Sequence, residues 1–384
     1  MSSRPKAAPG VVVVSVILLA FGSAALAAPR DMPPAQVAGS STACGLQRLD
    51  RQLVHCDRLT GAGVEAPLSV PVQYAPPVIT ELATFAAADC TGGCGSGSTI
   101  GPDRALYVTD GKGGRVLRID PRTGAQTTYA HGLPPSNDSF GIGGAMDVAF
   151  VGHTAYVLVT LVGPALGQPG VVDGIYRVRH DGTATPVADL GAWSSEHPPA
   201  GDFRVASGVQ YALQPFRGGL LVTDGHHNRV LRVSPDGKIS QLIAFANTVP
   251  TGIDIRGRTI YLGEAGPVPH LPEQGQVVNF TSRSPVARLV ASGAPLIVDV
   301  EFDAGGQLYV LSQGLWTLPN VPENAGQPAS PRTGKLLWLD RSGRLTPIVE
   351  DLDRPTSVEL VGDTALVVTL SGKVIRIDHV AHRH

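Results

Sequence analysis

The sequence predicts an all-β protein, a six-bladed β-propeller that is closed by a strand from its N-terminal part. Three observations predict this fold. A similar hairpin recurs six times, a further strand precedes each hairpin, and the last copy lacks a fourth strand while an unassigned one lies ahead of the first copy. The copies lie roughly 40 to 65 residues apart, which suits four-stranded blades with loops of uneven length.

The first element in the chain is a secretion signal, residues 1–28. A positively charged start leads into an apolar run at 11–21 that is too short to span a membrane, and a small-residue cleavage pattern stands at 25–27. We expect cleavage after Ala27 or Ala28, so that the mature protein is secreted to an extracytoplasmic space and has no membrane span. The alternative is an uncleaved anchor.

Residues 29–76 form the least regular part of the chain, an arm rich in Pro, Ala and Gly. It contains Cys44 and Cys56, and the other two cysteines are Cys90 and Cys94. Because export favours disulfides, we expect the local pairing of Cys44 with Cys56 and of Cys90 with Cys94. The alternative is a four-thiolate zinc site, since the C-x-x-x-C spacing is close to that of zinc ligands.

The propeller is predicted to occupy residues 77–384. Its clearest hairpin pairs Leu106–Thr109 with Arg115–Asp120 across a glycine-rich turn, and the residues of both runs favour β-strands. Five further hairpins show the same order, at 155–178, 220–233, 260–280, 308–340 and 366–378.

Two more strands complete most copies. Inner strands are predicted ahead of the hairpins at 146–150, 208–212, 252–255, 298–302 and 357–360, with a weak match at 97–100. Fourth strands are predicted after them at 185–190, 239–245, 287–291 and 345–351. The last copy ends at 378, so we predict that residues 78–85 supply its fourth strand. This pairing removes an unpaired edge and closes the ring.

Composition limits the function classes. Hydrophobic residues make up 43% of the 384 residues, enough for a large core, and no helical period is sustained after the first thirty residues. Charged residues make up 16% and the net charge is -2, so the basic excess of a nucleic-acid-binding protein is missing. We expect no nucleic-acid partner, and we expect the protein to be a monomer.

Candidate site residues lie where the inner strands begin, at the mouth of the central channel. Asp147 and Asp299 stand at matching positions of the second and fifth copies, and Thr251 lies at the entry of another inner strand. Opposed carboxylates can bind a divalent cation such as Ca²⁺ through oxygen. The other interpretation, which we favour, is that they accept hydrogen bonds from backbone N–H groups of neighbouring loops.

A second group of candidates lies at the hairpin turns. Asp224 repeats the position of a turn aspartate in the first copy, and Glu264 takes a related place, which favours a structural role in capping the turn. His226 and His227 can hold a metal or carry a proton, although adjacent residues in an extended loop point apart and no third ligand is evident. The sequence contains no G-x-S-x-G, H-E-x-x-H or dinucleotide-binding motif.

The unit LYVTDG…RVLRID resembles the NHL and SMP-30/gluconolactonase group of six-bladed propellers. Together with GPDRALYVTDGKGGRVLRIDPRTG at 101–124, HGLP at 131–134 and GGAMDVAFVGHTAYVLV at 143–159, it resembles the ScyD/ScyE family of exported propellers. The SMP-30 resemblance implies a divalent cation held by Asn, Asp and Glu. The matching positions hold Thr251, Met146 and Val298, none of which has a carboxylate or carboxamide, and this departure argues against lactonase activity.

Three hypotheses follow. The first is an exported, non-catalytic propeller of ScyD/ScyE type that binds a protein or a small-molecule ligand at its ring face. The second is a metal-dependent hydrolase or lactonase that uses Asp147, Asp299, Asp224 and Glu264. The third is a cell-surface structural protein stabilised by Ca²⁺.

Overall fold

The computed structural model describes residues 47–49, 52–54, 75–85, 90, 93–137, 141–200, 205–267, 270–321, 324 and 326–381. The chain divides into two compact units, Met1–Val72 and Gln73–His384. In the first unit, β1 (Gln47–Leu49) pairs antiparallel with β2 (Gln52–Val54). The predicted secretion signal and the predicted Cys44–Cys56 pair lie outside the described residues. Among the described residues, no helix is long and apolar enough to cross a membrane.

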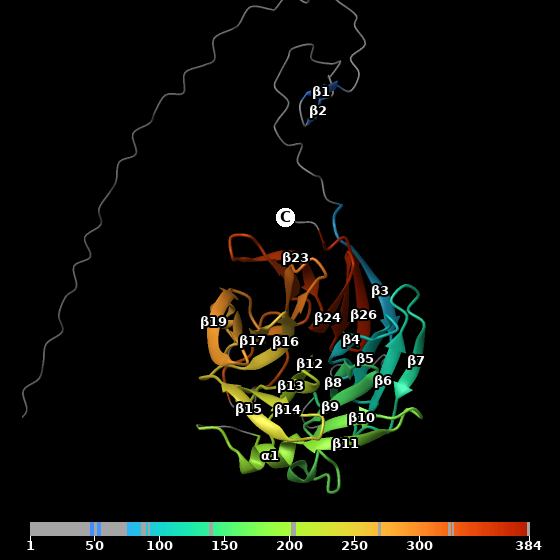
Figure 1. Cartoon of the computed structure of the whole chain (residues 1–384), viewed down its shortest axis with the longest axis vertical. Coiled ribbons are helices and arrows are strands. Elements are labelled where there is room, and N and C mark those ends of the chain that lie inside the picture. The colour runs from blue at the N-terminus through green and yellow to red at the C-terminus, as the bar shows by residue number, and fades with distance from the viewer. Residues whose placement is uncertain are drawn as a thin grey trace, which may run out of the picture. The chain divides into compact units, whose positions relative to one another are not determined.

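The second unit consists of six four-stranded antiparallel sheets around a centre, the predicted six-bladed β-propeller (Figure 1). Blade 1 contains β4 (Ser98–Ile100), β5 (Leu106–Asp110), β6 (Arg115–Ile119) and β7 (Gln126–Ala130). Blade 2 contains β8 (Gly144–Val151), β9 (Thr154–Thr160), β10 (Gly174–Val178) and β11 (Ala184–Asp189). Blade 3 contains β12 (Gln210–Phe216), β13 (Gly219–Asp224), β14 (Arg229–Val233) and β15 (Ile239–Ala244).

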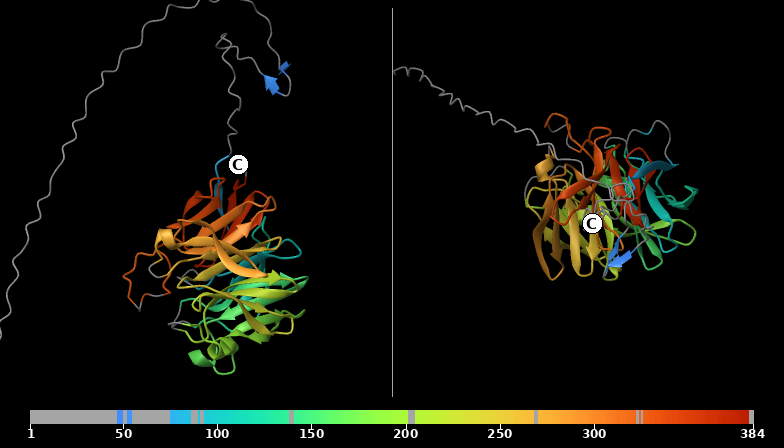
Figure 2. Two further views of the ribbon diagram at one scale, coloured as in Figure 1. Left: turned by 60° about the vertical axis from the view of Figure 1, so that its left-hand side comes forward. Right: turned by 90° about the horizontal axis from the view of Figure 1, so that it is seen from above.

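The second half of the ring repeats this order. Blade 4 contains β16 (Pro250–Arg256), β17 (Thr259–Glu264), β18 (Gln276–Thr281) and β19 (Ser284–Ser292). Blade 5 contains β20 (Ile297–Phe302), β21 (Leu308–Ser312), β22 (Gly334–Leu339) and β23 (Leu345–Leu352). Blade 6 contains β24 (Pro355–Val361), β25 (Thr364–Thr369), β26 (Lys373–Asp378) and β3 (Val78–Thr84). Figure 2 shows the six sheets from two other directions.

The predicted closure of the ring is confirmed. Strand β3 pairs antiparallel with β26, with Thr84 opposite Lys373 and Val78 opposite Asp378. The first and last blades also share one apolar cluster. Ala83 on β3 and Val368 on β25 belong to it, and blade 1 contributes residues such as Leu106 and Leu117. Since a blade cannot bury both faces of its sheet alone, this contact stabilises the ends of the chain against each other.

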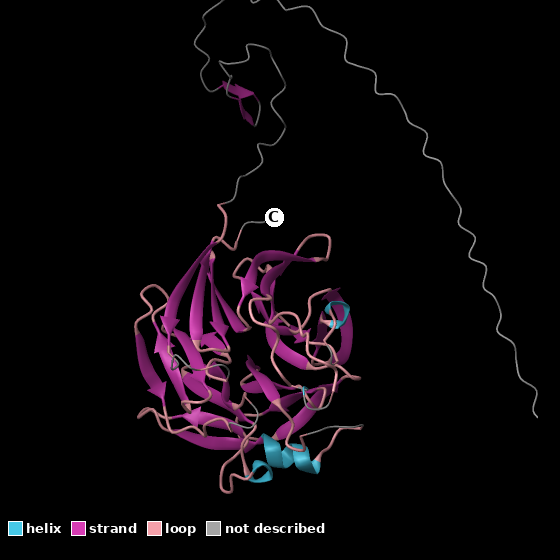
Figure 3. Cartoon of the chain, turned by 180° about the vertical axis from the view of Figure 1, so that it is seen from behind, coloured by secondary structure: helices cyan, strands magenta, loops and turns pink. Residues whose placement is uncertain are grey.

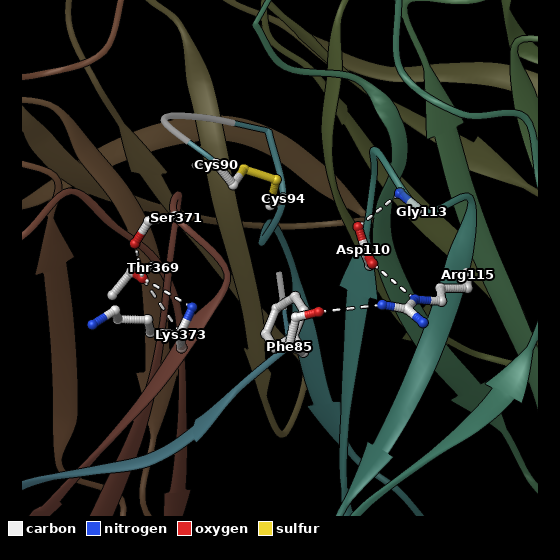
Figure 4. Close-up of a disulfide and its surroundings, with 9 residues drawn as sticks. All are labelled: Phe85, Cys90, Cys94, Asp110, Gly113, Arg115, Thr369, Ser371 and Lys373. Carbon is white, nitrogen blue, oxygen red and sulfur yellow. Dashed lines mark hydrogen bonds and ion pairs between the residues drawn. A yellow bond between two sulfur atoms is a disulfide. The ribbon is translucent and has the colours of Figure 1, made fainter. Parts of the chain in front are cut away.

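The closure region also contains the predicted disulfide between Cys90 and Cys94 (Figure 4). This bond uses two of the thiols that the alternative four-cysteine zinc site needs. Just before it in the chain, the backbone carbonyl of Phe85 accepts a hydrogen bond from Arg115 Nη2 of the first blade at 3.2 Å. Phe85 itself is buried in the cluster that the two blades share, so the end of the closing strand contacts blade 1 as well as β26.

Two elements are missing from the sequence prediction, namely β7, the fourth strand of blade 1, and a short helix. The predicted strand at 185–190 ends at Asp189, and a short helix, α1 (Leu190–Glu196), follows it (Figure 3). The carboxylate of Asp189 accepts a hydrogen bond from the N–H of Ala192 at 2.8 Å, which is N-terminal capping. The buried Leu190 anchors the helix to the apolar cluster between blades 2 and 3. Two 3-10 turns, η1 (Pro164–Leu166) and η2 (Pro272–Gln274), lie in loops.

Candidate functional site

The centre of the ring encloses a cavity of about 1060 Å³ to which all six inner strands contribute. Among the described residues, five carboxyl groups and one guanidinium, that of Arg104, line it. The carboxyl groups belong to Asp147, Asp254, Asp299, Glu301 and Glu359. The cavity is therefore acidic, although the net charge of the whole chain is only -2.

Asp147 and Asp299 connect neighbouring blades. Asp147 accepts hydrogen bonds from its neighbour Val148 at 2.8 Å and from the N–H of Leu213 in blade 3 at 2.7 Å. Asp299 repeats the arrangement with Val300 at 2.9 Å, and it reaches blade 6 through a hydrogen bond from the N–H of Val358 at 2.8 Å. The inner strand is an edge strand whose N–H groups face the channel, so these carboxylates satisfy donors that would otherwise lack a partner.

Asp254 and Glu359 likewise connect their blades to the next ones by accepting backbone hydrogen bonds. Asp254 accepts hydrogen bonds from the N–H of Ile255 at 2.6 Å and from that of Phe302 in blade 5 at 2.9 Å. Glu359, in blade 6, accepts one from the backbone N–H of Ile100 in blade 1. Four of the five cavity carboxyls thus join consecutive blades, which agrees with the structural interpretation of Asp147 and Asp299.

Burial raises the pKa of all these carboxyl groups. It raises the pKa of Asp299 to about 7, and backbone hydrogen bonds offset part of the effect. The pKa of Asp147 rises well above its ordinary range, first because the group is desolvated and further because Asp299 carries a like charge. Desolvation disfavours the ionised form, while N–H donors favour it.

Glu301 differs from the other four carboxyls. No hydrogen bond or ion pair joins its side chain to any other described residue, and it lines the cavity two positions beyond Asp299 on β20. Burial, followed by the charges of Glu359, Asp254 and Asp299, raises its pKa well above the ordinary range. It is the cavity carboxyl that the contacts between blades do not use.

His270 contributes a neutral imidazole to the cavity wall. Its Nδ1 lies 3.1 Å from the carbonyl oxygen of Ala265 and 3.0 Å from that of Gly266, so this nitrogen carries the proton. Burial lowers the pKa of His270, which keeps the ring uncharged. Its Nε2 therefore presents a lone pair, the arrangement of a hydrogen-bond acceptor or a general base.

The structure separates the two adjacent histidines of the hairpin turn, as expected for such neighbours. His226 lines the cavity, where its Nε2 lies 3.1 Å from the hydroxyl of Tyr211. His227 turns into the protein, where its Nε2 lies 2.9 Å from the carbonyl oxygen of Val205 and its Nδ1 lies 2.9 Å from Arg229 Nη2. The two rings thus belong to different environments.

Asp224 and Glu264 are buried away from the cavity wall. Asp224 accepts a hydrogen bond from Arg229 Nε at 2.8 Å in a buried ion pair. Glu264 accepts one from Gln276 Nε2 at 2.6 Å, and burial raises its pKa to about 6. Turn capping by an aspartate is seen in blade 1, where Asp110 accepts from the N–H of Gly113 at 2.8 Å (Figure 4).

Thr251 lines the cavity, yet its hydroxyl lies 3.0 Å from the carbonyl oxygen of Gly263 and 2.8 Å from that of Ile297 in the next blade. Within the described part of the chain, no group of three or more His, Cys, Asp or Glu side chains has a geometry that could hold a metal ion. The oxygens of Asp147 and Asp299 that a divalent cation would need accept N–H groups instead. The residues predicted for a cation site therefore do not fit one.

Sequence reasoning missed four cavity residues, namely Asp254, Glu301, Glu359 and His270. The first three occupy one position of their inner strands, two residues after the position of Asp299. Reading the same strand alignment two residues further would have found them. His270 has no counterpart in the repeat, because a loop with a positive φ of 58° places it.

No family model and no curated protein sequence matches the chain. Among solved structures, a gluconolactonase from Xanthomonas campestris is 16% identical with a TM-score of 0.51, covering 82% of this chain and 99% of its own. The PQQ-bound aldose sugar dehydrogenase from Streptomyces coelicolor is 14% identical with a TM-score of 0.51, covering 79% and 99%. A protein of unknown function from Bacteroides thetaiotaomicron is 11% identical with a TM-score of 0.53, covering 79% and 76%. Identities this low establish the shared propeller fold alone.

Proposed function

We propose that this chain is an exported binding propeller of ScyD/ScyE type, which holds a small organic ligand in its central cavity and catalyses no reaction. The observation that supports it best is the cavity of about 1060 Å³ at the ring centre. Ligand sites in proteins are typically concave, of this order of size, and lined by apolar surface with a few polar groups. Here Met146, Leu296 and Val298 supply apolar surface, and Glu301 and His270 supply polar atoms.

The non-catalytic part of the proposal follows from how the acidic side chains are used. Asp147, Asp254, Asp299 and Glu359 accept backbone hydrogen bonds that hold blades together. A catalytic carboxylate needs a free oxygen directed at the substrate. These four groups therefore serve the scaffold, which is what a rigid binding site requires.

The test blocks the mouth of the cavity. Asn247 is exposed in the loop before β16 and lines the cavity, so Asn247→Trp fills the entrance without disturbing the core. Val286→Trp on the exposed outer strand β19 is the matched control. We expect ligands from a small-molecule panel to raise the melting temperature of the wild type and of Val286→Trp, but not of Asn247→Trp. Equal responses from all three proteins would contradict binding in the cavity.

Hydrolysis is the second candidate function, and the observation that favours it is the lone pair of His270 Nε2 in the cavity. Such a nitrogen can act as a general base. Lactones and esters are incubated with the protein before and after chelation of metals. Turnover that is lost in His270→Gln would replace the binding proposal, and turnover lost on chelation would revive the metal-dependent form. A melting temperature raised by Ca²⁺ without turnover would support the third hypothesis, a calcium-stabilised structural protein.

A further inference from the structure

The carboxyl group of Glu301 has no structural use in the ring. The four other cavity carboxyls accept hydrogen bonds from backbone N–H groups, whereas no described residue donates to Glu301. A carboxyl group that is largely removed from water and lacks a donor stays ionised only if a partner compensates its charge, and otherwise it takes up a proton. The cavity that it lines is where such a partner can be placed.

The charged groups around Glu301 indicate whether that partner is a cation or an anion. Asp254, Asp299 and Glu359 lie near enough for their charges to act on it. In the described part of the chain, the one guanidinium that lines the cavity belongs to Arg104, which is exposed and makes no ion pair with Glu301. Carboxyl groups that are held close together repel one another once they are ionised, so they favour a cation, which offsets that repulsion, over an anion.

His270 provides an independent indication in the same cavity. Its side chain is only 8% exposed, its Nδ1 is fixed by two backbone carbonyls, and its Nε2 has no partner among the described residues. An uncharged imidazole nitrogen in this state accepts a hydrogen bond. Glu301 and His270 are therefore both hydrogen-bond acceptors that a ligand can satisfy by donating. An ammonium group suits them, because it has three donors and no acceptor.

An organic cation fits the cavity better than a metal ion. A hard divalent cation takes about six to eight oxygen ligands, and most carboxylate oxygens here accept N–H groups. The volume of about 1060 Å³ and the apolar side chains of Met146, Val298 and Leu370 suit a carbon skeleton. Resting on the binding function proposed above, we infer that the ligand is a protonated organic amine whose ammonium group is held by Glu301.

The experiment compares ligands that share a skeleton but differ in charge. Binding of benzylamine, benzyl alcohol and benzoate, and of putrescine and 1,4-butanediol, is measured by calorimetry at neutral pH. We expect each amine to bind at least about tenfold more tightly than its neutral counterpart, a factor that corresponds to about 1.4 kcal/mol. We expect Glu301→Gln to remove that preference and leave the affinity of the alcohols unchanged. Glu350→Gln, at an exposed position of strand β23, is the control.

The outcomes separate the two proposals. If alcohols or benzoate bind in a manner that Asn247→Trp abolishes, while no amine is preferred, the amine inference is wrong and the binding function stands. If none of the probes binds the wild type while a ligand of the small-molecule panel does, the amine inference is wrong and the binding function stands; if the panel fails too, both are overturned. Lowering the pH serves as a second measurement that needs no variant. Protonation of Glu301, and of Asp254, Asp299 and Glu359 that face it, should weaken amine binding and spare the alcohols. Amine binding that is insensitive to both changes would refute the inference.

Discussion

Replacing Asp147 by alanine should weaken the contact between blades 2 and 3. The side chain accepts hydrogen bonds from the N–H groups of Val148 and Leu213, both buried residues. Alanine leaves these two donors without a partner, and a buried unsatisfied donor costs about 1–3 kcal/mol. Removing the desolvated carboxyl, whose pKa is strongly raised, recovers part of this loss. We therefore expect the free energy of unfolding to fall by about 2–4 kcal/mol.

The assay is urea unfolding followed by tryptophan fluorescence, with melting temperature as a second measure. Asp181→Ala is the matched control, because Asp181 also accepts from a backbone N–H, that of Thr183, at 3.0 Å, but does so on the exposed surface. Water replaces the lost acceptor there, so the control should change the free energy of unfolding by less than about 1 kcal/mol. If Asp147→Ala destabilises no more than Asp181→Ala, the channel aspartates do not hold the blades together and the reasoning is wrong.

Three further predictions concern stability. Arg229→Ala should cost about 3–5 kcal/mol because it removes the cation that pairs with the buried Asp224 carboxylate. Arg115→Ala at the equivalent position of blade 1 should cost less, because Arg115 is partly exposed and water can take its place beside Asp110. Urea unfolding of both variants measures the difference, and equal losses would contradict it. Since the folded state holds the proton of Glu264 up to a pKa of about 6, stability should fall as pH rises from 4 to 7, by about 2 kcal/mol for this group. The Glu264→Gln variant should lack that part of the pH dependence, and an unchanged profile would refute the assignment. Replacing Cys90 and Cys94 by serine should cost about 2 kcal/mol because the loop is short, and reductant should lower the melting temperature of the wild type but not of the variant.

Most of the scaffold could be predicted from the sequence because the repeat is local. Each hairpin has its own alternation of apolar residues and its own turn, so strands such as β5 and β6 are recognisable in a single stretch. The closure by β3 was predictable because the last copy lacks a fourth strand and one unassigned strand lies ahead of the first copy. The Cys90–Cys94 pair was predicted as the local pairing in a chain expected to be exported. Helix α1 was missed because seven residues are too few to show a helical period.

The candidate site was only partly predictable from the sequence. The match between Asp147 and Asp299 was visible in the repeats, but whether their oxygens were free depended on N–H groups that lie 59 or more residues away in the chain. The same holds for His226 and His227, which are adjacent in sequence and face different environments.

The sequence by itself determined the repeat, the number of blades and the closure, because these depend on patterns within short segments. Only the tertiary structure decided which carboxyl the blades leave unused. It depends on the place where the six inner strands converge. Each acidic side chain there either accepts a hydrogen bond from the next blade or lacks such a donor. Glu301 is unmatched because no N–H of the neighbouring strand reaches it, and a property of that kind exists only once the ring has formed.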